Sequence, residues 1–180
     1  MKRVTVFCGS NPGARPEYVR AATHFGRVLA TRKIGLVYGG SKVGTMGALA
    51  RAALDAGGEV FGVMPTLLIE RELAFDGLSD LRIVETIHDR KALMLELGDA
   101  VVALPGGLGT LEEFFEVVSW GQLGLHQKPF GLLNVCGYFD PLMRFLDHAV
   151  DQRFVKAEHH AMILIDDTPE GLLDRLQQPP

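Results

Sequence analysis

The sequence has few cysteines, no excess of basic charge and no long apolar run. Its two cysteines, Cys8 and Cys136, are too few for a disulfide framework, and both lie beside apolar segments, which indicates reduced thiols. The formal net charge of −4 gives no global attraction to nucleic acid or an anionic membrane. No apolar run approaches the ~18 residues of a membrane span, and the apolar part of MKRVTVFCGS is too short for a signal peptide. These absences predict a cytoplasmic protein that binds neither nucleic acid nor membrane.

Several motifs of cofactor and metal sites are also missing. The six histidines are scattered, and His159 and His160 lack the i, i+4 spacing of a helical zinc pair, so we expect no metal. No lysine lies in a pattern typical of a pyridoxal Schiff base, so we expect no cofactor. The GxGxxG fingerprint of dinucleotide-binding folds is absent too, which disfavours NAD.

Short apolar runs alternate with helical patterns along the whole chain. The runs are continuous rather than alternating, as is typical of strands covered on both faces. Strands are predicted at 3–8, 34–39, 59–64, 81–85, 99–104, 129–134 and 160–165, and helices near 16–32, 45–56, 88–97, 110–123, 139–151 and 169–177. This order predicts an α/β fold with a doubly wound parallel sheet and helices on both faces. With no linker or repeat, we expect residues 1–180 to form a single domain. Segment 65–80 is expected to be a surface loop with a short helix.

Glycine-rich segments follow several of the predicted strands, where open parallel sheets bind their ligands. In YGGSKVGTMG (38–47), Gly39 and Gly44 have the GxxxxG spacing of a phosphate-binding P-loop. Thr45 and Met46 then stand where a P-loop requires lysine and serine or threonine, which disfavours ATP hydrolysis. The segment is therefore either a ligand-binding loop or a tight turn between strand and helix.

The segment LPGGLGTLEE (104–113) joins a predicted buried strand to a helix. Glycines allow backbone N–H groups to approach an anion closely, and a helix N-terminus attracts one. A structural alternative is that Thr110 caps the helix and Glu113 closes a capping box. Apolar residues at helical spacing define a core face, so Glu113 should face the cleft or a partner chain, whereas Glu112 should be a surface charge. The core face consists of Leu111, Phe114, Phe115 and Val118.

The segment HDRK places two cations, Arg90 and Lys91, in the first turn of a predicted helix, where the helix dipole disfavours them. We expect a bound anion or carboxylates opposite, and the alternative is a solvated charge cluster with Asp89. A phosphate cradle, an arginine and the carboxylate of Glu113 around one cleft suggest a sugar phosphate or nucleoside monophosphate as ligand. In N-glycosidic cleavage, such a carboxylate stabilises the oxocarbenium-like sugar or activates water.

These motifs together resemble those of the LONELY GUY family, whose members are often mislabelled lysine decarboxylases. PGGLGTLEE matches PGGxGTxxE, YGGSKVGTMG resembles the GGGxxGxMG loop, and HDRK resembles the MHxRK segment. VFCGSNPG and WGQLGLHQKP are also similar, so the resemblance covers nearly the whole chain. The sequence departs from the pattern at Ser41, where a third glycine is usual, and at Ile87, where methionine is usual.

The resemblance implies a Rossmann-like homodimer that hydrolyses cytokinin riboside 5′-monophosphates, and also AMP, to the free base and ribose 5-phosphate. It implies that Arg90 and Glu113 are the catalytic pair, in which Arg90 either binds Glu113 or aids departure of the base. It also implies a set of substrate-binding residues: Gly39, Gly40, Glu72, Lys91, Gly106, Gly107, Gly109 and Thr110.

Two further expectations come from the residues themselves. One is an alternative function, a nucleotide-binding sensor or carrier module without turnover, which would have no need of the Arg90–Glu113 pair. The other is an apolar surface that favours a dimer with active sites near its interface, formed by Phe139, Leu142, Phe145, Leu146, Trp120, Phe114 and Phe115.

Overall fold

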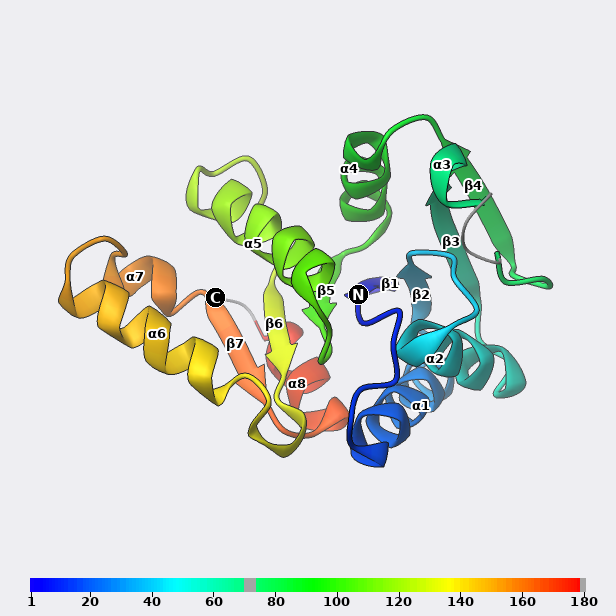
Figure 1. Cartoon of the computed structure of the whole chain (residues 1–180), viewed down its shortest axis with the longest axis horizontal. Helices are drawn as coiled ribbons and strands as arrows, with labels where there is room; N and C mark the ends of the chain where they lie inside the picture. Colours follow the sequence, from blue (N-terminus) through cyan, green and yellow to red (C-terminus); the bar gives the residue numbers. More distant parts are fainter. Residues whose placement is uncertain (70–73, 179–180) are drawn as a thin grey trace.

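A seven-stranded parallel sheet forms the centre of the molecule (Figure 1). The computed structural model describes residues 1–69 and 74–178. The strand order is β4-β3-β2-β1-β5-β6-β7, which confirms the predicted α/β fold. The strands are β1 (Arg3–Phe7), β2 (Gly35–Tyr38), β3 (Val60–Pro65), β4 (Asp80–Val84), β5 (Ala100–Ala103), β6 (Phe130–Leu133) and β7 (Ile163–Asp166).

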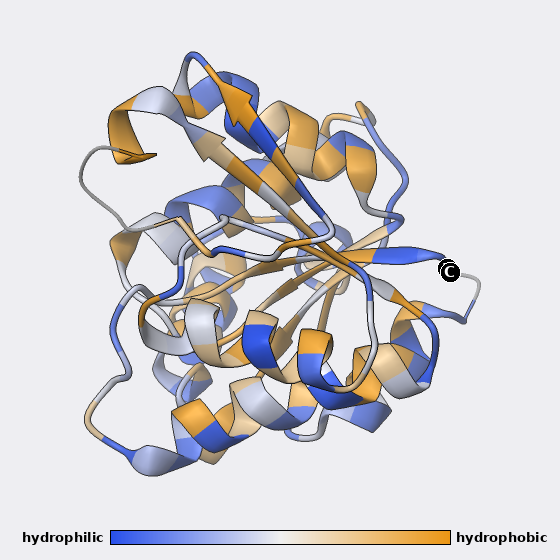
Figure 2. Cartoon of the chain, turned by 90° about the vertical axis from the view of Figure 1, so that its right-hand side faces the viewer, coloured by the Kyte–Doolittle hydropathy of each residue, from blue (hydrophilic) through white to orange (hydrophobic). Residues whose placement is uncertain are grey.

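Helices cover both faces of this sheet because its central strands are apolar on both sides (Figure 2). In β5, Val102 faces one layer of the core, and its neighbours Val101 and Ala103 face the other. The first layer contains α1 (Pro16–Thr31), α2 (Gly44–Asp55) and α8 (Pro169–Leu176), and the second contains α4 (Ile87–Leu97), α5 (Leu108–Gln122) and α6 (Asp140–Asp151). Shorter turns are α3 (Thr66–Ile69), α7 (Ala157–His160) and the 3₁₀ turn η1 (Val135–Gly137).

The sequence pattern placed one strand too early. Segment 160–165 was predicted as the last strand, but β7 begins at Ile163 and His160 ends α7. The N–H groups of His159 and His160 both bond to the carbonyl of Lys156, so these residues form a helical turn. A single turn of four residues is too short to give the apolar periodicity by which helices are recognised.

The order of the strands reverses between β1 and β5, so the loops that follow β1, β2 and β5 converge at one edge of the sheet. The loop after β2 is held against the loop after β1. The backbone N–H groups of Thr45 and Met46, in the first turn of α2, both donate to the carbonyl of Gly9, at 3.1 and 3.3 Å. Gly44 has φ +61°, and a Cβ there would collide with the backbone of Ser10. YGGSKVGTMG is therefore mainly a tight turn, whose helix N-terminus binds the neighbouring loop.

The apolar set expected on the outside is largely part of the core. Phe114 and Phe139 are fully buried and Leu146 is nearly so, because α5 and α6 pack these side chains onto the sheet. Phe145 of the same set is 64% exposed. Among the helices of the described residues, none is long and apolar enough to cross a membrane.

Candidate functional site

A cavity of about 680 Å³ lies at the carboxyl ends of β1, β2 and β5, beside the point where the strand order reverses. Its volume is in the range of small-molecule sites. Its walls come from the loop after β1, from the glycine loop and first turns of α5, and from residues of α2 and α4. Segments far apart in the sequence therefore meet at the position where α/β folds bind nucleotides.

The glycine loop leads directly into the N-terminus of α5. Helix α5 begins at Leu108, two residues earlier than predicted, and its N-cap is Gly107. No side chain caps it, so the proposed capping box of Thr110 and Glu113 is wrong. Thr110 is instead a buried residue of the first turn, packed against Gly106. The uncapped first-turn N–H groups leave a positive helix end beside the cavity, which suits a phosphate.

Arg90 of α4 and Glu113 of α5 meet across the cavity, with 3.5 Å between the guanidinium and the carboxylate. Both side chains are mostly buried, at 12% and 13% exposed. Arg90 also donates to the carbonyl oxygens of Val63, at 3.2 Å, and Gly39, at 3.4 Å. A Cβ at Gly39 would collide with the guanidinium, so this glycine leaves room for Arg90.

Burial changes the acidity of Glu113. Loss of solvent raises the pKa of this carboxyl above its ordinary value, and the neighbouring guanidinium of Arg90 offsets part of that rise. Perturbed carboxyls in clefts are typical of groups that take part in acid–base or charge-stabilising chemistry. Glu113 therefore lines the cavity and has a raised pKa, a combination that is typical of reactive carboxyl groups.

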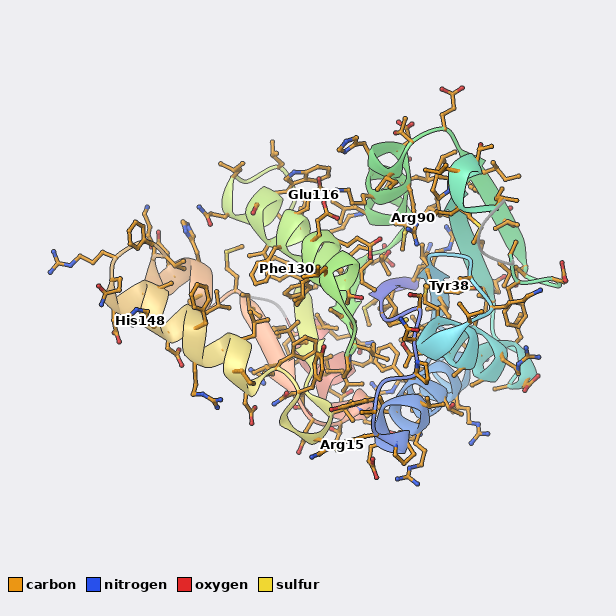
Figure 3. All side chains as sticks on the ribbon, in the orientation of Figure 1. Arg15, Tyr38, Arg90, Glu116, Phe130 and His148 are labelled. Atoms are coloured by element: carbon orange, nitrogen blue, oxygen red, sulfur yellow. The ribbon has the colours of Figure 1, made fainter. Side chains whose placement is uncertain are left out.

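Lys91 does not line the cavity. It is 5% exposed and forms ion pairs with Glu112 and, at 3.1 Å, with Glu116, both on α5. Burial lowers the pKa of Lys91, but the hydrogen bonds to the two carboxylates outweigh this effect and raise it. The ion pairs of Lys91 join α4 to α5. Figure 3 labels Arg90 on the first of these helices and Glu116 on the second. The cations of α4 thus face carboxylates, as expected, and Glu112 is an exposed charge, also as expected, that pairs with Lys91.

Cys8 lies on the floor of the cavity, at the end of β1, but it is poorly suited to nucleophilic chemistry. Burial raises its thiol pKa to about 12, so the thiolate is scarce at neutral pH. This supports a structural role for Cys8 as a small residue at the end of a strand.

The structure brings most of the predicted site residues to the cavity. Its lining includes Arg90, Glu113, Gly39, Gly106, Gly107, Gly109 and Thr110. Gly40 is not part of the lining; it has φ +81°, and its carbonyl accepts a hydrogen bond from the N–H of Phe75. Glu72 lies outside the described residues. Ser41 is buried without a positive φ, so this turn does not require the third glycine.

Other residues of the cavity were not singled out from the sequence. They include Ser10 and Asn11 in the loop after β1, Tyr18 of α1, Met94 of α4, and Tyr138 after β6. The position of the two loops at the carboxyl edge of the sheet was the available signal. Which side chains of those loops reach the cavity depends on turns that no sequence motif describes.

The fold and the cavity define a class: α/β proteins with a glycine-lined helix N-terminus and an arginine–carboxylate pair at the sheet's switch point. A family model described as "Possible lysine decarboxylase" matches residues 46–176. The chain is 48% identical to a cytokinin riboside 5′-monophosphate phosphoribohydrolase of Rhodococcoides fascians, over 99% of this chain and 90% of the relative. It is 44% identical to a protein of that name from Arabidopsis thaliana, over 98% of this chain and 82% of the relative. The chain therefore belongs to this family, the LONELY GUY proteins.

The fold alone is shared more widely. A solved structure described as a molybdenum cofactor binding protein, from Rippkaea orientalis, superposes with a TM-score of 0.73 at 22% identity. The match covers 98% of this chain and 96% of that chain. The shared fold therefore does not by itself indicate the function of this chain.

Replacing Lys91 tests the ion pairs between α4 and α5. Lys91→Met keeps most of the side-chain volume but leaves Glu112 and Glu116 facing each other without their cation. We expect the free energy of unfolding to fall by about 2 kcal/mol, less than for a fully buried pair because Glu112 can turn to solvent. Urea denaturation at pH 7 measures this change.

Lys156→Met is the matched control, because Lys156 pairs with Glu158 while both side chains are mostly exposed. Its effect should stay within about 0.5 kcal/mol. A Lys91→Met protein as stable as the wild type would show that the α4–α5 ion pairs contribute little.

Proposed function

We propose that this protein hydrolyses the N-glycosidic bond of cytokinin riboside 5′-monophosphates, and of AMP, to the free base and ribose 5-phosphate. The proposal rests on the ion pair between Arg90 and Glu113, which lies beside the uncapped, glycine-lined N-terminus of α5. The names of the curated relatives support the substrate class.

The helix N-terminus and Glu113 act on different ends of the proposed substrate. Backbone N–H groups of Gly106, Gly107, Gly109 and Thr110 surround the phosphate, where positive potential is favourable. Glu113 lies four residues after Gly109, about 6 Å further along the helix axis. That displacement moves the carboxylate away from the phosphate and toward the ribose. It thereby reduces the electrostatic repulsion between the carboxylate and the phosphate.

In the reaction, water adds to the anomeric carbon and the bond from that carbon to the base nitrogen breaks. The base leaves with the bonding electrons and takes up a proton, while the sugar passes through an oxocarbenium-like state. The carboxylate of Glu113 stabilises the developing positive charge and can accept the proton of the attacking water. Arg90 orients Glu113 through their ion pair and favours the ionised form of its carboxyl group.

The cavity does not favour the decarboxylation of lysine, which is the chemistry in the description of the matching family model. A Schiff base requires a lysine amine in contact with the ligand. Among the residues that line the cavity there is no lysine, and the nearby Lys91 is buried between carboxylates. The carrier or sensor alternative needs only the glycine loops, so it gives no reason for the buried Arg90–Glu113 pair.

We also propose a cytoplasmic homodimer that contains one domain per chain. The two cysteines are unpaired, which is usual for a reducing compartment. Leu123 and Leu125, in the turn after α5, are each 69% exposed, and Phe145 is exposed on α6. Exposed leucines close together are typical of a contact between protein surfaces.

Glu113→Gln tests the catalytic carboxylate. The amide keeps the size of the side chain but cannot balance an oxocarbenium charge or accept a proton. We expect release of ribose 5-phosphate from AMP and isopentenyladenosine monophosphate to fall by about 10³-fold, with AMP binding retained. Chromatography of the free base and calorimetric binding measure the two quantities.

Glu158→Gln is the control, because Glu158 is an exposed glutamate of α7 away from the cavity. It should keep full activity and an unchanged melting temperature. Full activity in the Glu113→Gln protein would refute the assignment, and binding of AMP by the wild type without base release would favour the carrier alternative.

The pH dependence of kcat/KM tests the environment of Glu113. Because burial raises the pKa of Glu113, the carboxylate should be lost as pH falls through a value above the ordinary ~4.3 of glutamate. Arg90 opposes that rise, so Arg90→Gln should move the acid limb to higher pH, while Arg90→Lys should leave it nearer the wild-type position. The substrate phosphate titrates equally in all three proteins and cancels in the comparison. An acid limb that moves downward in Arg90→Gln would contradict this electrostatic assignment.

Sedimentation tests the dimer. The wild type should sediment at twice the chain mass of 19.6 kDa, and the double change Leu123→Glu and Leu125→Glu should shift it toward the monomer. Ile83→Glu is the matched control, because Ile83 is equally apolar and 61% exposed but lies on the far edge strand β4. A monomeric wild type, or a dimer that the double change leaves intact, would overturn this part of the proposal.

A further inference from the structure

Tyr138, in the loop after β6, contacts the glycine loop that leads into α5. Its hydroxyl donates a hydrogen bond to the carbonyl oxygen of Gly106, a residue 32 positions earlier in the chain. Both residues line the cavity. The bond therefore ties the backbone of the glycine loop to a side chain from a separate strand-end loop.

The turn that carries Tyr138 has a specific backbone shape. Cys136 and Gly137 both have positive φ, 52° and 69°, so the chain reverses sharply before Tyr138. The side-chain oxygen of Asn134 accepts a hydrogen bond from the N–H of Phe139 at 2.8 Å, which closes the turn. Left-handed conformation at a residue other than glycine is uncommon and indicates a turn defined by its surroundings.

The ring of Tyr138 is also held on two sides. It packs edge to face on Tyr18 of α1, with ring centres 5.5 Å apart, and on Phe139, at 5.0 Å. Phe139 is buried in the core. Because the backbone and the ring are both fixed, the position of the hydroxyl is set by the fold and not by the ligand.

The peptide group that receives this bond joins two glycines, Gly106 and Gly107. Without Cβ atoms on either side, such a peptide plane can rotate at low steric cost. In a trans peptide, the carbonyl and the following N–H point in opposite directions. Fixing the carbonyl of Gly106 on Tyr138 therefore also fixes the N–H of Gly107, directed away from Tyr138.

We propose that Tyr138 is a positioning residue for the phosphate group of the substrate. Its hydroxyl holds the Gly106–Gly107 peptide so that the amide groups of the loop and of the first turn of α5 face the anion. The same hydrogen bond keeps the carbonyl oxygen of Gly106 turned away from that anion. This role rests on the proposed function, because it assigns the cradle to the phosphate of a nucleoside monophosphate.

Tyr138→Phe removes the hydroxyl and keeps the ring contacts with Tyr18 and Phe139. We expect KM for AMP to rise about fivefold, as for the loss of one hydrogen bond, with kcat within twofold of the wild type. The Kd for ribose 5-phosphate should rise by the same factor, while inhibition by adenosine, which has no phosphate, should not change. A merely structural defect would weaken adenosine and ribose 5-phosphate alike.

The matched control is Tyr38→Phe. The hydroxyl of Tyr38 is buried at the end of β2 with no hydrogen-bond partner among the described residues, and Tyr38 does not line the cavity. The same chemical change there should leave KM and both binding measurements at wild-type values.

A second readout does not depend on the reaction. Backbone ¹⁵N relaxation of residues 106–110, measured by NMR without ligand, should give lower order parameters in Tyr138→Phe than in the wild type and in Tyr38→Phe. A wild type that releases no base would defeat the proposed function, while the order parameters and ribose 5-phosphate binding would still decide the role of Tyr138. Unchanged order parameters in Tyr138→Phe, or a Kd for ribose 5-phosphate equal to that of the wild type, would overturn the inference.

Discussion

The site depends on the pairing of two adjacent cations of α4 with three carboxylates of α5. Arg90 meets Glu113 inside the cavity, and Lys91 meets Glu112 and Glu116 behind it. The cations lie in the first turn of their helix, where the dipole disfavours them, so they need partners outside that helix. The two sets of ion pairs fix the helices against each other and thereby set the distance between the guanidinium and the proposed catalytic carboxylate.

The two glycine loops look alike in sequence but serve different purposes. The first turn of α2 is occupied by the carbonyl of Gly9, so its positive end stabilises a neighbouring loop. The first turn of α5 has no cap and faces the cavity. This difference is the reason to assign the proposed phosphate site to the second loop, which is also the loop that Tyr138 contacts.

Patterns of apolar residues predicted seven strands to within a few residues and the six longer helices, and the glycine segments predicted the edge of the sheet where the cavity lies. Continuous apolar runs follow from strands covered on both faces, and the glycine segments follow strands whose carboxyl ends must meet. Local details were less accessible: Thr110 fits a capping box in sequence, yet α5 starts earlier and buries it. Lys91, expected near the nucleotide, is instead paired behind the cavity, because the register between α4 and α5 decides which cation faces inward.

The sequence by itself determined the α/β class, the family motifs and the residue types available for chemistry, since these depend on periodicity and spacing along the chain. Only the tertiary structure decided which of those residues meet. The 3.5 Å approach of Arg90 to Glu113 and the hydrogen bond from Tyr138 to Gly106 join segments that are more than twenty residues apart. Such contacts depend on how helices pack on the sheet and how loops turn at its edge, and these are properties of the whole fold.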